Sequence, residues 1–204
     1  MRRLNRWFLL AACSLVMALC VTVAWGAHQA QRQLAEKMIR LHVIANSDSE
    51  ADQALKLRVR DAILAEAEEI LTACADLPEA EAQLGAALER MTAIAEATVA
   101  QAGYDYEVSA VLSYEVYPTR DYETFRLPAG QYLSLRMTIG AGAGRNWWCV
   151  VFPPLCNAAT TEEFVKTAEG AGLTAEELAL LTEESEGVVV RFKVIEWVEG
   201  IVNG

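Results

Sequence analysis

The segment Gly144–Cys156, with the sequence Gly-Arg-Asn-Trp-Trp-Cys-Val-Val-Phe-Pro-Pro-Leu-Cys, constrains the fold of this chain more than any other part. Its apolar run from Trp147 to Phe152 predicts a strand. The strand ends at Pro153, because proline has no amide hydrogen to donate to a neighbouring strand. Successive strand residues point to opposite faces of a sheet. Trp147 and Trp148 therefore face opposite ways, and both faces need cover, from the protein's own core or from a partner.

A strand that is apolar on both faces is expected at the centre of a sheet. The short, glycine-rich loop Gly140–Gly144 precedes this one, so we expect antiparallel pairing with the alternating segment at residues 132–140. A separate alternating segment, Ile39–Ala45, places its apolar residues on one face and Arg40 and His42 on the other. That pattern predicts a half-buried strand.

Helical periodicity follows the first strand and returns in the tail. The expected helix N-termini carry Ser49 with Asp52 as a capping box, Pro78, Thr160 or Thr161, and Thr174 with Glu177. The segment Val188–Val202 fits either the start of a strand or a closing helix. The whole order of elements predicts a mixed α+β fold, with helices packed on a largely antiparallel sheet and one apolar helix before it.

The N-terminus predicts export from the cytoplasm. Arg2, Arg3 and Arg6 precede the uncharged, mostly apolar stretch at residues 7–27, which is the layout of a signal peptide. The stretch is also as long as a bilayer-spanning helix needs, roughly 20 residues, so an uncleaved anchor is the alternative. We divide the chain into a signal peptide or membrane anchor at residues 1–27, a helical stem at 28–38 and a single exported α+β domain at 39–204.

The charge of the chain excludes two classes of partner. The formal net charge is −11, and without the three N-terminal arginines it is −14. A nucleic-acid-binding domain needs a basic surface, and docking on anionic lipid needs basic residues too. We therefore expect no nucleic acid as a partner, and contact with the membrane only through the N-terminal segment.

Two of the five cysteines, Cys149 and Cys156, flank the prolines that end the apolar strand. Outside the cytoplasm a disulfide is allowed, and the turn at the prolines can bring the two Cα atoms within bridging range. A disulfide between these residues is our prediction, with two buried thiols as the alternative.

We expect no catalytic residues, no metal site and no cofactor. The serine-elbow motif and the helical His-Glu-x-x-His motif are absent from the sequence, and no set of His, Cys, Asp and Glu has metal-ligand spacing. The alternative function is an extracytoplasmic cysteine enzyme, a thiol redox protein or a hydrolase, that uses Cys149 with His42 as its base.

The most unusual surface expected on the exported domain is aromatic and glycine-rich, which favours a binding role, since Trp, Tyr and Arg anchor protein interfaces. We expect contacts from the turn Asn46–Asp48 and the loop Gly144–Trp147. The basic residues near Lys56 are either part of this surface or ion-paired with Asp52 and Asp61. The candidate partner-binding residues are Arg40, Asn46, Ser47, Asp48, Lys56, Arg60, Gly144, Asn146, Trp147 and Trp148.

Two segments resemble the signatures of the stage II sporulation protein R family. The first begins as Arg-Leu-His-Val-Ile-Ala-Asn-Ser-Asp-Ser at Arg40–Ser49 and continues through Asp52, Gln53, Lys56 and Val59–Asp61. The second comprises Pro128–Gly130, Tyr132, Ile139, Gly140 and Gly144–Cys156. Both are long and occur in the family's order, and they bracket residues 40–156.

The resemblance implies a signalling protein and not an enzyme. Members of this family are made in the forespore of endospore-forming bacteria and exported across its membrane. In the space between forespore and mother cell they trigger a membrane-embedded aspartic protease, which cleaves the inactive precursor of a mother-cell sigma factor. That protease is thus the partner that the resemblance implies.

Overall fold

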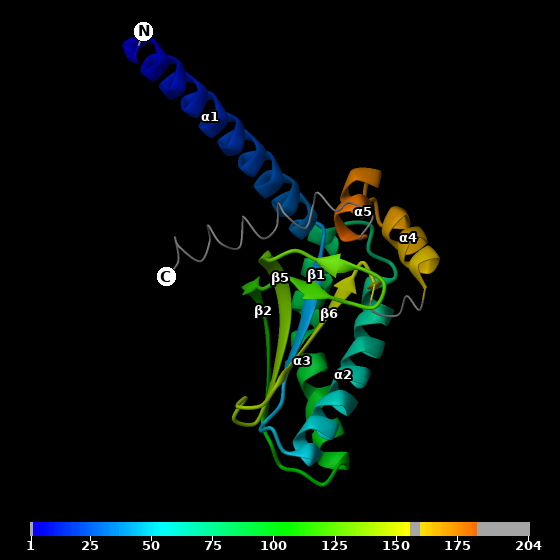
Figure 1. Ribbon diagram of the computed structural model, residues 1–204. Helices are drawn as coiled ribbons and strands as arrows, with labels where there is room; N and C mark the ends of the chain where they lie inside the picture. The colour runs from blue at the N-terminus through cyan, green and yellow to red at the C-terminus, as the bar shows by residue number, and fades with distance from the viewer. Residues whose placement is uncertain (1, 156–159, 183–204) are drawn as a thin grey trace.

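The computed structural model describes residues 2–155 and 160–182 of the chain (Figure 1). Its centre is a four-stranded mixed sheet. Two long helices, α2 and α3, run antiparallel to each other and pack on one face of this sheet (Figure 1). In order across the sheet, the strands are β2 (Val108–Tyr117), β5 (Gly130–Ile139), β1 (Ile39–Ile44) and β6 (Asn146–Phe152). The helices are α2 (Glu50–Leu71) and α3 (Leu77–Gln101). The expected mixed α+β fold is confirmed.

The strand pairing differs from the expectation. The apolar strand β6 pairs antiparallel with β1 and not with β5, and β1 lies between them and runs parallel to β5. β6 is therefore an edge strand of this sheet and not a central one. The glycine-rich loop is long enough to cross the end of β1, because its Gly144 amide donates to the Ala45 carbonyl oxygen at 2.9 Å. Adjacency in sequence predicted a hairpin, but the inserted β1 pairs with both strands.

Both faces of the sheet are covered, which explains why an edge strand is so apolar. Cys149 and Val151 of β6 belong to the main core beneath α2 and α3. Val150 points the other way into a second core. That second core also receives side chains from the small hairpin of β3 (Arg120–Asp121) and β4 (Arg126–Leu127), and from α4 (Thr161–Gly170) and α5 (Ala175–Leu181).

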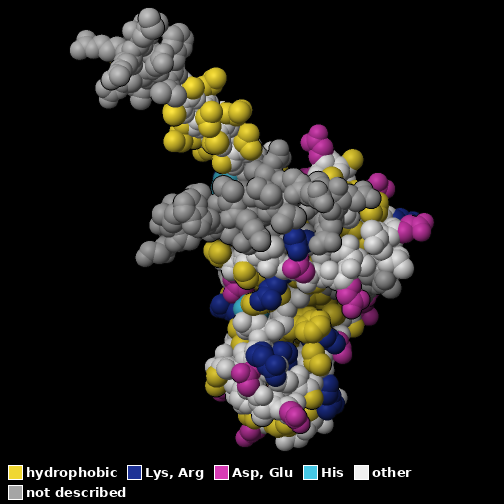
Figure 2. Space-filling model, in the orientation of Figure 1, with side chains coloured by type: hydrophobic (Ala, Val, Ile, Leu, Met, Phe, Trp, Pro, Cys, Tyr) yellow, Lys and Arg dark blue, Asp and Glu magenta, His cyan; other side chains and the backbone are white. Residues whose placement is uncertain are grey.

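The N-terminal helix α1 (Arg2–Ala35) projects from the domain (Figure 1). Its segment Ala12–Ala35 is long and apolar enough to cross a membrane, and the visible face of the coloured part of the projecting helix carries hydrophobic side chains (Figure 2). The end of α1 is part of the domain, because Leu34 and Met38 are fully buried in the second core. The end of the expected helical stem at residues 28–38 thus contributes side chains to the second core.

The helix starts follow the sequence closely. Ser49, Asp76, Thr160 and Thr174 are the N-caps of α2, α3, α4 and α5. Thr174 and Glu177 form a complete capping box. The Ser49 hydroxyl accepts from the Asp52 amide, but the Ser49 amide donates to the Ser47 hydroxyl and not to the Asp52 carboxylate, which accepts from Asn46 and Ser47. The segment Val188–Val202 lies outside the described residues.

Candidate functional site

Two loops that are almost a hundred residues apart in sequence meet at one end of the sheet. We call this region the loop end and define it as the turn Ala45–Ser49, the loop Gly140–Arg145 and the first turn of α2. The Ala143 amide donates to the Asn46 carbonyl oxygen at 3.1 Å. At Gly144 there is no room for a side chain, since a Cβ atom would lie 2.2 Å from the Ser47 carbonyl oxygen. Glycine is therefore required where the two backbones touch.

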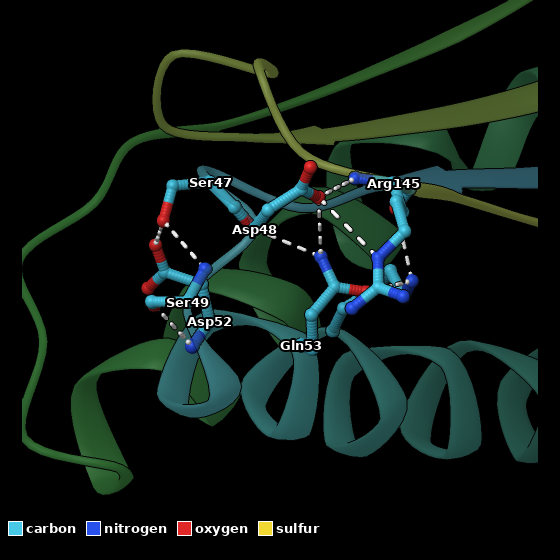
Figure 3. A network of polar contacts seen from close by, with 7 residues as sticks. Ser47, Asp48, Ser49, Asp52, Gln53 and Arg145 are labelled. Carbon is cyan, nitrogen blue, oxygen red and sulfur yellow. Dashed lines mark hydrogen bonds and ion pairs between the residues drawn. The ribbon is translucent and has the colours of Figure 1, made fainter.

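Polar side chains join the turn, the loop and α2 (Figure 3). Asp48 Oδ1 accepts from the Arg145 amide at 2.7 Å, and Gln53 Nε2 donates to the Ser47 carbonyl oxygen at 2.9 Å. The Ser47 hydroxyl donates to Asp52 Oδ2 at 2.5 Å. Figure 3 shows these groups directed toward one another, so the network holds the loop against the helix.

Asn46 connects the two loops through its side-chain amide. Its Nδ2 donates to Asp52 Oδ2 at 2.9 Å, and its Oδ1 accepts from the Ala141 amide at 3.0 Å. Hydrogen bonds from Ser47 and Asn46 hold the pKa of the buried Asp52 carboxyl below its usual value. Asp52 is therefore an ionised acceptor that fixes the conformation of the turn.

Lys56 is buried beneath the same loop. Its Nζ donates to Gln53 Oε1 at 2.7 Å and to the Arg145 carbonyl oxygen at 2.9 Å. Burial is the main factor that lowers the pKa of Lys56, and repulsion by the Arg145 guanidinium lowers it further. The sequence allowed an ion pair between Lys56 and Asp52, but the ammonium group of Lys56 instead binds the side-chain amide of Gln53 and the backbone carbonyl of Arg145. The expected pairing of Asp61 with a basic residue of this group is confirmed, since Arg60 binds Asp61 at 2.6 Å.

The loop end continues through Arg145 into a partly exposed group of side chains, which we call the Trp147 patch: Leu57, Arg60, Arg145 and Trp147. Trp147 is 38% exposed and Leu57 is 37% exposed. The Arg60 guanidinium lies 4.3 Å from the centroid of the Trp147 indole, and Leu57 precedes Arg60 by three residues on the same side of α2. A tryptophan, two arginines and a leucine thus reach solvent together, beside the exposed Asn146.

The opposite face of the sheet carries a second polar region, centred on Arg40. We call it the polar sheet face, and its residues are Arg40, His42, Glu115, Tyr117, Tyr132, Ser134, Arg136 and Trp148. Arg40 has no exposed surface, so the half-buried strand expected at residues 39–45 is buried on both faces at this point. The Arg40 guanidinium carbon lies 3.9 Å from the Tyr117 ring centroid and 5.1 Å from that of Tyr132.

Arg40 has few polar partners for a buried cation. Its Nη2 donates to the Tyr122 hydroxyl at 2.7 Å. Its Nε and Nη1 have no hydrogen-bond partner among the described residues. Burial raises the pKa of Tyr117 and of Tyr132 well above the usual value, so both rings stay neutral. Stacked aromatic rings thus stabilise the guanidinium, and its hydrogen-bonding capacity is left mostly unused.

Glu115 is the hub of the rest of the polar sheet face. It accepts from Ser134 at 2.8 Å and from Arg136 at 2.8 Å, and it contacts His42 Nδ1 at 3.1 Å. Burial alone would raise the pKa of Glu115, but hydrogen bonds from Ser134 and His42 and the charge of Arg136 outweigh burial, and the pKa is lowered. The Tyr117 hydroxyl also donates to Glu115, at 3.3 Å, so Glu115 is an ionised carboxylate held by four partners.

The structure separates the candidate partner-binding residues into two groups. Arg40 and Trp148 lie on the polar sheet face, and the others gather at the loop end and the Trp147 patch. Sequence reasoning missed Glu115, Arg136, Tyr117 and Tyr122, although the alternation of polar residues along β2 and β5 carried the signal for the first three. Pairing of β2 with β5 brings Glu115, Tyr117 and Arg136 onto one face, and β1, which pairs with β5, adds Arg40 and His42 beside them.

The structure does not support the Cys149 and His42 dyad. Cys149 is opposite Leu41 in the register and faces the helices, whereas His42 faces the other side of the sheet. Cys149 is also disulfide-bonded, so it carries no free thiol. Cys13, Cys20 and Cys74 are free, and Cys156, the expected partner of Cys149, lies outside the described residues. In residues 2–155 and 160–182, no group of three or more potential ligands could hold a metal ion.

The fold therefore defines a class: a mixed α+β domain that follows an N-terminal helix of membrane-spanning length, with two separate regions of polar residues among the described parts of the chain. Comparison with known proteins then gives the family. The sequence model of stage II sporulation protein R matches residues 35–162, which include all four strands of the main sheet. The chain belongs to the stage II sporulation protein R family, and the resemblance noted from its two signatures is confirmed.

A relative supports the same assignment over more of the chain. Stage II sporulation protein R of Bacillus subtilis (strain 168) is 30% identical over 187 residues, which cover 83% of this chain and 84% of that protein. No solved structure matches the chain. The chain is thus a sporulation protein, and its N-terminal apolar helix is consistent with a signal or an anchor.

Proposed function

We propose that this chain is an exported signal that activates a membrane-embedded aspartic protease during sporulation. The signal acts in the space between forespore and mother cell, and the protease then cleaves the inactive precursor of a mother-cell sigma factor. The observation that carries the proposal is family membership, over residues 35–162 of a domain that follows a helix of membrane-spanning length. The chain itself performs no chemistry in this scheme.

The Trp147 patch and the exposed side of the loop end are the proposed contact surface. Trp147 and Arg60 are of the residue types that dominate interface energies, and both are presented on a rigid support. That support is the hydrogen-bonded junction of Asn46, Ser47 and Asp52, which needs little reordering when a partner binds. Asn46 and Ser47 act by holding the loop, while Trp147 touches the partner.

Activation requires that the signal bind the active state of the protease more tightly than the inactive state. A ligand with equal affinity for the two states shifts no equilibrium, however tightly it binds. To move a protease from about 1% to about 99% active, the difference in affinity must be about 10⁴-fold. A contact surface fixed in one conformation is suited to such discrimination, because it favours one arrangement of the partner.

The test is a reconstitution in a bacterium that does not sporulate. The full-length chain, the candidate protease and the sigma-factor precursor are expressed together, and cleavage of the precursor is measured by immunoblot. We expect cleavage only when all three are present. The control chain lacks residues 2–27 and so stays in the cytoplasm, and it should give no cleavage.

Two results would contradict the proposal. The first is cleavage that does not depend on the full-length chain. The second is cleavage that persists when the chain is confined to the cytoplasm. The mass of the mature protein recovered from the same cells decides between a cleaved signal peptide and an uncleaved anchor.

A further inference from the structure

We propose a binding site for a carboxylate group on the polar sheet face, in which Arg40 binds the carboxylate and Tyr122 occupies its position in the free protein. The carboxylate is an aspartate or glutamate side chain of the protein partner. This choice of source rests on the proposed function, whereas the existence of the site rests on the structure of the domain alone.

The charges on this face are unbalanced. The one acidic side chain of the polar sheet face, Glu115, is already engaged by His42, Ser134 and Arg136. Arg40 and the neighbouring Arg120, whose guanidinium lies 3.7 Å from the Trp148 ring centroid, form no ion pair with any described residue. A buried charge without a counter-ion is costly to a folded protein. The region therefore has the charge to receive an anionic group.

The unsatisfied polar atoms agree with this reading. Nε and Nη1 of Arg40 and Nε of Arg120 are buried without a hydrogen-bond partner in the described parts of the chain. All three are guanidinium nitrogens, which donate and cannot accept. A group that satisfies these nitrogens must therefore be a hydrogen-bond acceptor. A carboxylate is both anionic and able to accept two parallel hydrogen bonds from a guanidinium.

The Tyr122 hydroxyl already accepts the hydrogen bond from the Arg40 nitrogen that such a carboxylate would need. A carboxylate binds along an edge of the guanidinium, and the two edges are Nε with Nη2 and Nη1 with Nη2. Both edges include Nη2, which donates to the Tyr122 hydroxyl. Tyr122 is half-buried, whereas Tyr117 and Tyr132 on the guanidinium faces are buried. Rotation of the Tyr122 side chain is thus the smallest movement that frees an edge of Arg40.

Tyr122 is held where such a rotation is feasible. It lies between β3 and β4, a two-stranded sheet separate from the main one. Its ring stacks on Phe125 at 4.6 Å between centroids, and its hydroxyl is 3.5 Å from the Trp148 carbonyl oxygen. Phe125 is buried against Phe164 of α4. The hairpin therefore remains anchored by Phe125 when Tyr122 alone changes rotamer.

The first experiment measures binding of acetate, the simplest carboxylate, to the full-length chain in detergent at pH 7. Thermal unfolding is followed in sodium acetate and in sodium chloride of equal ionic strength. We expect a saturable rise in Tm with acetate. Arg40→Met should remove this rise, and Tyr122→Phe should tighten acetate binding at least threefold, because the competing hydroxyl is gone. Arg60→Met, which removes another arginine stacked on an aromatic ring, should keep the wild-type response.

Three outcomes of this experiment would overturn the site. One is equal Tm for the wild-type chain in the two salts. Another is a wild-type acetate response in folded Arg40→Met. If Arg40→Met does not fold, Tyr122→Phe decides, and an acetate response no stronger than that of the wild-type chain rejects the role of Tyr122 and with it the proposal.

The second experiment tests the partner. In the reconstituted cleavage assay, folded Arg40→Met should reduce precursor cleavage at least tenfold. Normal cleavage by a variant that no longer binds acetate would overturn the assignment of the carboxylate to the partner. Failure of the wild-type chain to trigger cleavage would overturn the proposed function, and the acetate measurements would still decide the site.

Discussion

The loop end and the polar sheet face are both built around polar residues of β1 or of the turn that follows it, yet they differ in how fully those residues are hydrogen-bonded. At the loop end, Asn46, Ser47 and Asp48 each have a partner at 2.9 Å or less. On the polar sheet face, Arg40 is fully buried and uses one of its three nitrogens. A satisfied network stabilises one conformation, whereas unused donors raise the free energy of the free protein until something binds them.

The largest expected effect is at the junction of the two loops. Gly144→Ala should lower the free energy of unfolding by about 3 kcal/mol, because the new Cβ would overlap the Ser47 carbonyl oxygen and the loop must move away. The measurement is urea unfolding of the full-length chain. Gly85→Ala on α3 is the control, since its Cβ would meet nothing within 4 Å, and it should stabilise by about 0.5–1 kcal/mol. Equal effects of the two substitutions would show that the loop contact is loose.

Removing the polar link between the loops should have the next largest effect. Asn46→Ala should cost about 2 kcal/mol of unfolding free energy, because the Ala141 amide and the Asp52 carboxylate each lose a hydrogen bond. Asn146→Ala changes the same residue type at an exposed position at the start of β6 and should cost less than about 0.5 kcal/mol. A similar loss in both variants would weaken the contrast drawn between the two regions.

We predict that the free energy of unfolding depends on pH through the Glu115 carboxylate of the polar sheet face. The folded-state pKa of Glu115 lies below its ordinary value of 4.5, so its contribution to stability is complete above that pH and is lost as pH falls through the folded-state pKa. Between pH 5 and about pH 3, Glu115→Gln should therefore lose less unfolding free energy than the wild-type chain. Chemical unfolding at a series of pH values measures this difference. Parallel curves for the two proteins would contradict the role given to Glu115.

The smallest expected effect on stability is at the Trp147 patch. Trp147→Ala should cost about 0.5–1 kcal/mol, chiefly the contact between the indole and Arg60, while precursor cleavage should fall at least tenfold. Val111→Ala is the matched control, because Val111 is also 38% exposed but lies on β2 at the other edge of the sheet. Undiminished cleavage with Trp147→Ala would remove this patch from the proposed contact surface.

Much of the fold was predictable because it depends on local sequence. Ser49, Thr160 and Thr174 marked helix starts that the structure confirms, since capping uses an amide only three residues away. The N-terminal helix followed from the length of its apolar stretch. The meeting of the turn at Asn46 with the loop at Gly144 was only partly foreseen, because both were chosen as contact regions without any sign that they touch.

The sequence by itself determined the helix boundaries, the alternating strands, the apolar N-terminal helix and the two signatures of the family. Only the tertiary structure decided that β1 lies between β5 and β6, that Arg40 is buried between tyrosines, and that Cys149 and His42 face opposite sides of the sheet. The physical reason is the range of the interactions. A helix cap joins residues three apart, whereas Arg40 meets Tyr122 across 82 positions and Asp48 meets Arg145 across 97, and such pairings depend on strand order, which no local pattern contains.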